Sequence, residues 1–294
     1  MPTDYDFKLR VRAPRPTVFE KLLRIEHLAR WFCGWSRIEP KVGGKFLFGG
    51  ETCIVQPEGR GWETRIEEGE TLRRFSFTWP IQGAPTRVAY ELEDAGADTL
   101  LRATHRGMPI RESTSGAIQD AWRTCLGNLK SIAEGRSDSV RPEHAPIEGS
   151  ALRLSNLIEV PQERVHQALT DPGEVDHWST GGMPRGRSSF GPSETSSFFF
   201  LPGDGPDGVS DEADDEVLLT WPRQGYKLDV SLKLEPKSTG TAIYVLARGY
   251  PAGSQPAILR DRGRWSDLLV CLKNLLEAGD AGFANAYEDQ ARAS

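Results

Sequence analysis

Apolar and polar residues alternate in several short segments of the first half of the chain. The alternation occupies residues 7–11, 75–79, 88–92 and 101–105, and it is typical of strands that bury one face. Between residues 118 and 132 the apolar spacing changes to three or four, which predicts one long helix with an apolar stripe. The short gaps between the strands favour hairpins, so we expect an antiparallel sheet with one face in solvent.

The same order of elements returns in the second half. Three tryptophans recur in order, at offsets of 147, 142 and 143 residues: Trp31 with Trp178, Trp79 with Trp221, and Trp122 with Trp265. Because tryptophan is rare, this recurrence indicates two copies of one domain in tandem. We predict a first domain at residues 1–137, a linker at 138–149, a second domain at 150–280 and a tail at 281–294. The Gly-, Asp- and Pro-rich stretch from 203 to 216 is expected to be an acidic loop.

Charge and composition narrow the function classes. The formal net charge is −6 and no basic run occurs, which disfavours nucleic-acid binding. The four cysteines are widely spaced and the five histidines show no ligand-like pairing, so we expect free thiols, no metal and no cofactor. There is neither an apolar run of 18 residues nor an apolar leader at the start of the sequence. We therefore expect a cytoplasmic protein without membrane insertion.

Short motifs lie at matching places in both halves: Ala13-Pro14 and Val160-Pro161, His27–Trp31 and Glu174–Trp178, two Thr-Trp-Pro stretches, and Arg106-Gly107 with Arg248-Gly249. With Gly43-Gly44-Lys45-Phe46 and the two tryptophans of the closing helices, they make the chain resemble the SRPBCC (START-like) superfamily. More narrowly, it is similar to the branch related to the activator of heat-shock protein 90 ATPase. The resemblance implies an α+β architecture of two helix-grip domains, each a curved antiparallel sheet wrapped around a long C-terminal helix with two short helices. It also implies a cavity between sheet and helix that often holds an apolar ligand.

Strand parity predicts which side chains of the first domain face the long helix, because alternate residues point to opposite faces. We predict a ligand site formed by a largely aromatic set: Trp31, Trp35, Phe46, Phe48, Phe75, Phe77, Trp79, Tyr90, Leu101, His105 and Trp122. The alternative is that these rings simply fill the core. The polar members, His105 and Tyr90, are weak candidates for catalysis, and their counterparts are Ala247 and Leu232.

Three functions of different classes follow. The leading hypothesis is non-catalytic binding of a small hydrophobic or aromatic molecule by the first domain. The second domain has Arg187-Ser188-Ser189-Phe190 in place of Gly-Gly-Lys-Phe, and we interpret it as a divergent, structural partner. The resemblance leaves open an enzyme of the polyketide cyclase/aromatase or hydrolase-like kind, with His105 and Tyr90 as acid and base, or an antibiotic self-resistance and sequestration protein. A chaperone co-factor that binds a protein partner is suggested by the family name alone.

Overall fold

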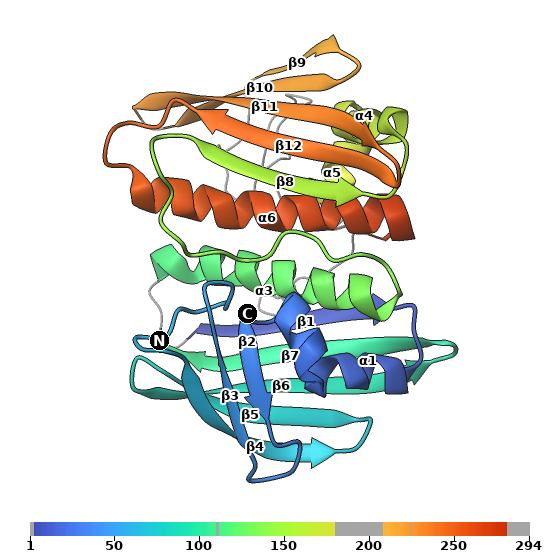
Figure 1. The fold of residues 1–294 in the computed structure, drawn as a ribbon, viewed down its shortest axis with the longest axis vertical. Coiled ribbons are helices and arrows are strands. Elements are labelled where there is room, and N and C mark those ends of the chain that lie inside the picture. The colour runs from blue at the N-terminus through green and yellow to red at the C-terminus, as the bar shows by residue number, and fades with distance from the viewer. Residues whose placement is uncertain (1–2, 110–111, 180–207, 224, 281–294) are drawn as a thin grey trace, which may run out of the picture. The chain divides into compact units, whose positions relative to one another are not determined.

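The computed structural model describes residues 3–109, 112–179, 208–223 and 225–280. They form two compact units (Figure 1), with the boundary between His144 and Ala145 inside the predicted linker. Each unit pairs an antiparallel sheet with a long closing helix, so the predicted α+β helix-grip architecture is confirmed. None of the helices in the described ranges is long and apolar enough to cross a membrane.

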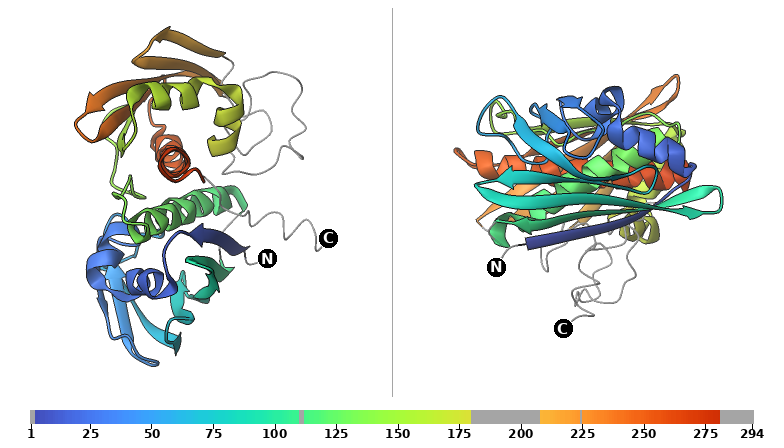
Figure 2. Two further views of the ribbon diagram at one scale, coloured as in Figure 1. Left: turned by 90° about the vertical axis from the view of Figure 1, so that its right-hand side faces the viewer. Right: turned by 90° about the horizontal axis from the view of Figure 1, so that it is seen from below.

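The first unit contains a seven-stranded antiparallel sheet in the order β1-β7-β6-β5-β4-β3-β2. Helix α3 runs along one face of this sheet, as Figure 1 and the further views in Figure 2 show. The elements are β1 (Thr3–Val11), α1 (Arg15–Leu23), α2 (Ile25–Trp31), β2 (Trp35–Ile38), β3 (Lys45–Gly49), β4 (Trp62–Glu70), β5 (Arg74–Ile81), β6 (Ala84–Ala95), β7 (Asp98–Met108) and α3 (Glu112–Ala133).

The second unit has a smaller sheet, in the order β8-β12-β11-β10-β9, and helix α6. The C-terminal end of α6 is set by Gly279, which takes a left-handed conformation (φ 67°) and donates its N–H to Leu275 O. The elements are β8 (Leu152–Ile158), α4 (Gln162–Thr170), α5 (Pro172–Ser179), β9 (Gly208–Ala213), β10 (Glu216–Arg223), β11 (Tyr226–Lys237), β12 (Gly240–Arg248) and α6 (Gln255–Ala278).

The expectation of a loop across residues 203–216 is wrong for residues 208–213. Gly208–Ala213 forms strand β9, which pairs with β10 in a register that places Val209 opposite Leu219. A strand at the sheet edge has one pairing neighbour and tolerates acidic side chains, so it lacks the apolar signal of an inner strand. Residues 203–207, the Arg187–Phe190 segment and the tail from 281 to 294 lie outside the described residues.

The predicted linker packs against the units instead of standing apart from them. Asp138 forms an ion pair with Arg30 at 3.3 Å, and the backbone N–H of His144 donates to Glu51 O at 3.1 Å. Beyond the boundary, the Ile147 carbonyl accepts a hydrogen bond from Gln255 Nε2 at 2.7 Å. Each end of the segment is therefore tied to the unit to which it belongs.

Equivalent tryptophans make the same contact in the two units. Trp31 Nε1 donates to the carbonyl of Lys21 at 2.9 Å, and Trp178 Nε1 donates to the carbonyl of Ala168 at 2.8 Å. Both acceptors lie ten residues earlier, in the preceding short helix. This shared contact supports the interpretation of two tandem copies, which stays a prediction.

Candidate functional site

The predicted aromatic set of the first unit forms one buried cluster between the sheet and α3. Ten of its eleven members have at most 3% of their surface exposed. Neighbouring ring centroids lie between 4.7 Å (Phe46 to Phe48) and 6.5 Å (Tyr90 to Trp122) apart, the range in which aromatic rings attract one another. Strand parity therefore predicted the inward side chains of this unit well.

Phe32 belongs to the centre of the cluster, although sequence reasoning did not include it. Its ring lies 5.0 Å from Phe48, 5.9 Å from Trp79 and 6.3 Å from Trp122. The residue follows directly after α2, where neither a strand nor a helix period predicts the direction of a side chain. Its position in the apolar pair Trp31-Phe32 was the available signal.

The prediction that Trp35 joins the inward set is wrong. Trp35 lies on the short edge strand β2 and is 42% exposed. Its ring instead covers the backbone of Gly49 and Gly61, where an added Cβ would come within 2.9 Å and 2.5 Å of the indole. Two glycines thus provide a flat surface at the sheet edge, and the indole lies on it instead of turning into the core.

His105 takes part in a hydrogen-bond chain whose direction can be assigned. Trp122 Nε1, which can only donate, lies 3.2 Å from His105 Nδ1, so that nitrogen accepts and carries no proton. His105 Nε2 therefore holds the proton and donates to Thr86 Oγ1 at 2.7 Å. The Thr86 hydroxyl in turn donates to the carbonyl of Trp79 at 2.7 Å.

This chain of hydrogen bonds gives His105 a structural role. Both ring nitrogens are engaged, and the imidazole stacks on the Trp79 ring at 5.3 Å with 5° between the planes. Burial in this apolar surrounding lowers the pKa of His105 to about 3, because the charged form loses its hydration. The side chain is therefore neutral near pH 7 and has no lone pair available for a substrate proton.

Two donors in the cluster have no partner. The Tyr90 hydroxyl and Trp79 Nε1 are buried and make no hydrogen bond. Burial, followed by the nearby thiols of Cys125 and Cys33, raises the pKa of Tyr90, so the phenol keeps its proton and can donate. A buried polar atom without a partner costs roughly 1–3 kcal/mol, and in native proteins such an atom calls for a specific explanation such as a bound water or ligand.

Tyr90 and His105 do not form an acid–base pair. Both rings border Trp122, at 6.5 Å and 5.6 Å between centroids, but no hydrogen bond joins them. General acid–base work needs a proton donor or acceptor within reach of the reacting atom, and His105 is fully committed to its neighbours. The predicted catalytic combination therefore has no geometric support.

The thiols of the first unit are free but not activated. Burial raises the pKa of Cys53 to about 12, and it also raises the pKa of Cys33 and Cys125. A nucleophilic cysteine needs a lowered pKa, so these thiols behave as small apolar side chains. Across the described ranges, no group of three or more His, Cys, Asp and Glu side chains is placed to hold a metal ion.

One known family matches the first unit. Residues 12–134 match the model of the family described as activator of Hsp90 ATPase homolog 1-like protein. The first unit of the chain is therefore similar to this family. The match begins directly after β1 and ends within one residue of the last residue of α3, so it covers β2 to β7 and the closing helix but not β1. No curated protein matches the chain.

Solved structures are similar at low sequence identity. CalU16 from Micromonospora echinospora is 21% identical, with a TM-score of 0.36, over 45% of this chain and 75% of its own. DynU16, a putative protein in the dynemicin biosynthetic locus, is 15% identical, with a TM-score of 0.39, over 94% of this chain and 98% of its own. The Aha1 dimer from Colwellia psychrerythraea is 15% identical, with a TM-score of 0.38, over 45% of this chain and 96% of its own.

Proposed function

We propose that the first unit binds a small, flat, neutral hydrophobic molecule between its sheet and α3. The observation that carries this proposal is the pair of unpartnered donors, Tyr90 and Trp79, inside an otherwise apolar aromatic cluster. A ligand with a carbonyl or ether oxygen accepts from one or both of them. Ligand sites commonly combine such an apolar lining with a few convergent polar groups.

The surroundings of these donors favour a flat ring system. Tyr90 stacks parallel to Phe75 at 6.1 Å and meets Trp31 edge-on at 81°. Aromatic faces and edges bind another ring through the same offset and edge-to-face contacts that they make with one another. A ligand that inserts here replaces ring–ring contacts within the protein by similar contacts with itself.

The surroundings also select against charge. His105 is neutral and Tyr90 keeps its proton, so neither side chain offers a counter-charge. Burying an ionised group without a partner costs far more than burying a neutral one. A neutral ketone, quinone or phenol ether fits the site, whereas a carboxylate does not.

The enzyme alternative lacks an observation in its favour, because the acid–base pair that it requires is not formed. Binding without turnover needs only what the cluster provides, namely an apolar surrounding and two donors. The family description names a chaperone activator, and a pull-down of the intact chain with an Hsp90-class chaperone tests that role.

A matched pair of ligands tests the proposal. Fluorenone and fluorene have nearly the same shape, but only fluorenone carries a carbonyl acceptor. We expect fluorenone to bind the intact chain more tightly than fluorene by about 3- to 10-fold, the value of one added hydrogen bond of about 1 kcal/mol. Calorimetric titration or native mass spectrometry measures both.

Variants decide whether Tyr90 is responsible for that difference. Tyr90→Phe removes only the hydroxyl and should reduce the preference for fluorenone while fluorene binding stays the same, because of the two donors only Trp79 Nε1 then remains. Trp35→Phe, at the exposed sheet edge, is the matched control and should keep the preference. Equal binding of both compounds to the wild type and to Tyr90→Phe, or no saturable binding of either, would show that the rings merely fill a core.

A further inference from the structure

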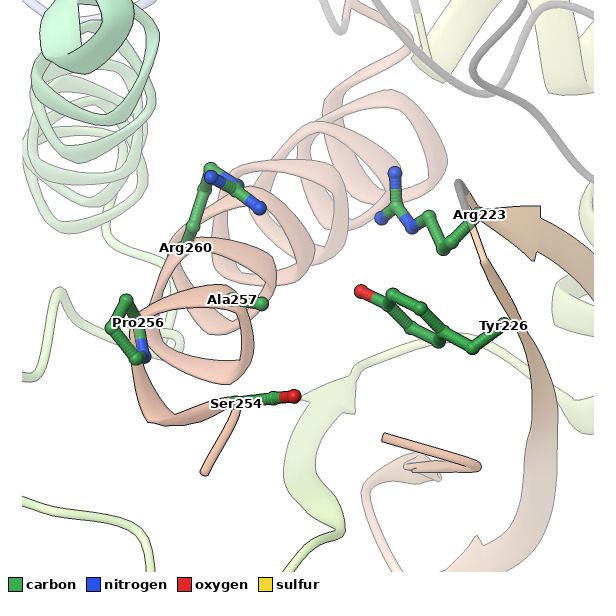
Figure 3. Close-up of a pocket in the computed structure, with 6 residues that line it drawn as sticks. All are labelled: Arg223, Tyr226, Ser254, Pro256, Ala257 and Arg260. Carbon is green, nitrogen blue, oxygen red and sulfur yellow. The ribbon is translucent and has the colours of Figure 1, made fainter. Parts of the chain in front are cut away.

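The second unit has a surface pocket where the β10–β11 hairpin meets the first turns of α6. Its volume is about 450 Å³, and its lining is Arg223, Tyr226, Ser254, Pro256, Ala257 and Arg260. Figure 3 shows the Arg260 guanidinium and the Tyr226 hydroxyl directed from opposite sides toward the space beside Ala257. The small side chain of Ala257 leaves this space open between the polar groups.

A buried polar network holds the Arg223 side of the pocket in place. Arg223 Nη2 pairs with Asp261 Oδ1 at 3.0 Å, and the Tyr250 hydroxyl donates to Asp261 Oδ2 at 2.9 Å. The guanidinium also lies 3.6 Å above the Trp221 ring centroid. Asp261 is only 1% exposed, and both of its carboxylate oxygens have a partner, as a buried carboxylate requires.

The first unit has no such network at the equivalent positions. At offsets of 142 and 143 residues, four polar residues of the second unit replace four apolar ones: Arg223 for Ile81, Tyr226 for Ala84, Tyr250 for Met108 and Asp261 for Ile118. The hairpins themselves are equivalent, since Ile81 pairs with Ala84 as Arg223 pairs with Tyr226. The fold therefore does not require these polar groups, and their joint presence needs a reason particular to the second unit.

The charge balance of the pocket is positive, although the whole chain has a net charge of −6. Asp261 offsets the charge of Arg223, whereas Arg260 is exposed and has no ion pair within the described part of the chain. Ser254 makes no capping hydrogen bond to α6, which leaves its hydroxyl available to a ligand. The pocket thus presents a guanidinium and two hydroxyl groups beside the face of an aromatic ring.

We propose that this pocket of the second unit binds a small organic anion through a carboxylate or phosphate group. Arg260 supplies the charge-assisted hydrogen bonds to its oxygens, Tyr226 and Ser254 add hydroxyl contacts, and the Tyr226 ring packs against its organic part. The buried Asp261 network positions Arg223 at the edge of the pocket. The second unit is then a binding domain with a ligand chemistry opposite to that proposed for the first unit.

Titration of the intact chain at constant ionic strength tests this site. The probes are inorganic phosphate, phenyl phosphate and benzoate, with benzyl alcohol as the neutral control. We expect at least one anion to bind saturably and benzyl alcohol not to bind. Arg260→Gln should weaken that binding by about tenfold, because it removes a charge-assisted hydrogen bond. Arg153→Gln, at an exposed arginine of β8 outside the pocket, removes the same charge and should leave binding unchanged.

The relative affinities of the three anions identify the chemical group that the pocket prefers. Benzoate that binds more tightly than both phosphates identifies a carboxylate ligand, and the reverse identifies a phosphate ligand. An adventitious ion only is the conclusion if Arg260→Gln and Arg153→Gln weaken binding equally, and that result overturns the proposal, as does the absence of saturable binding. Tyr90→Phe in the first unit should leave the anion titration unchanged, so this site can fail or succeed independently of the first.

Discussion

Acid should destabilise the first unit through His105. This side chain is fully buried, and burial lowers its pKa in the folded state to about 3, from an ordinary value of 6.5. Below pH 6.5 the unfolded chain binds a proton that the folded chain cannot, so stability falls as the pH falls. The loss amounts to about 2 kcal/mol between about pH 7.5 and pH 5, and it levels off near about 5 kcal/mol once the pH is below 3.

Urea unfolding of the intact chain, followed by tryptophan fluorescence between about pH 7.5 and pH 5, measures this loss. The comparison is with His105→Phe, which keeps a ring against Trp79 but cannot titrate. Carboxylates with lowered pKa values, such as Asp6 and Glu134, act mainly below about pH 4.5 and therefore outside this window. His27 also has a lowered pKa, so His27→Gln serves as the control for a partly exposed histidine.

The expected result is a flatter pH dependence in His105→Phe, with a difference of about 2 kcal/mol from the wild type across the window. His105→Phe itself should be less stable near pH 7, because Trp122 Nε1 and Thr86 lose their partner. If wild type and His105→Phe show the same slope, then His105 accepts a proton in the folded state. The assigned direction of the hydrogen-bond chain, and the neutral site built on it, would then be wrong.

Five further substitutions have defined outcomes, each measured as the loss in free energy of unfolding in urea. Thr86→Val should lower the free energy of unfolding by about 2–3 kcal/mol, because it leaves a buried imidazole N–H unpaired. Thr99→Val loses one hydrogen bond to a backbone carbonyl and should lower it by about 1 kcal/mol. Equal losses would contradict the assigned direction of the His105 hydrogen bonds. Gly249→Ala should cost several kcal/mol, since its Cβ would lie 2.2 Å from the Lys227 carbonyl oxygen at φ 100°. Gly107→Ala should cost only about 1–2 kcal/mol, since the nearest atom to its Cβ, Thr86 Cα, is 4.0 Å away. Trp35→Ala should cost about 1–2 kcal/mol, below the 3–5 typical of a core tryptophan, and a larger loss would place its ring in the core.

The alternating pattern predicted the inner strands of the first sheet because those strands bury one complete face. Phe75, Phe77 and Trp79 lie on β5 with at most 2% of their surface exposed, as their parity requires. The pattern failed at the sheet edges, where Trp35 is exposed and β9 carries acidic residues. An edge strand gains its place from backbone pairing with one neighbour, which leaves little trace in side-chain hydrophobicity.

The inward position of His105 was predictable, but its chemistry was not. Thr86 has the same parity as Tyr90 on β6, so the pattern contained the information that both face inward. What the pattern lacks is the pairing of one polar group with another across strands and helix. In the folded unit Trp122 and Thr86 occupy both nitrogens of the imidazole, so the candidate base is a structural side chain.

The two units share contacts that hold the fold and differ in the polar residues of the two proposed sites. Thr99 Oγ1 donates to the Ala13 carbonyl in the first unit, and Thr241 Oγ1 donates to the Val160 carbonyl in the second. Each joins the last strand before the closing helix, β7 or β12, to the turn before the first helix of its unit. Such a contact needs only the backbone of the fold, and it occurs in both units.

Side chains at the candidate sites behave in the opposite way. His105 and Tyr90 correspond to Ala247 and Leu232, so the second unit lacks the polar groups of the first cluster, while the Arg223 network exists only in the second. Burying the Asp261 carboxylate requires its desolvation, which is unfavourable, whereas apolar side chains fill the equivalent positions of the first unit without it. A purely structural role of the second unit therefore does not explain Asp261. Two opposite polar arrangements on one shared framework support the proposal that the two units bind different ligands.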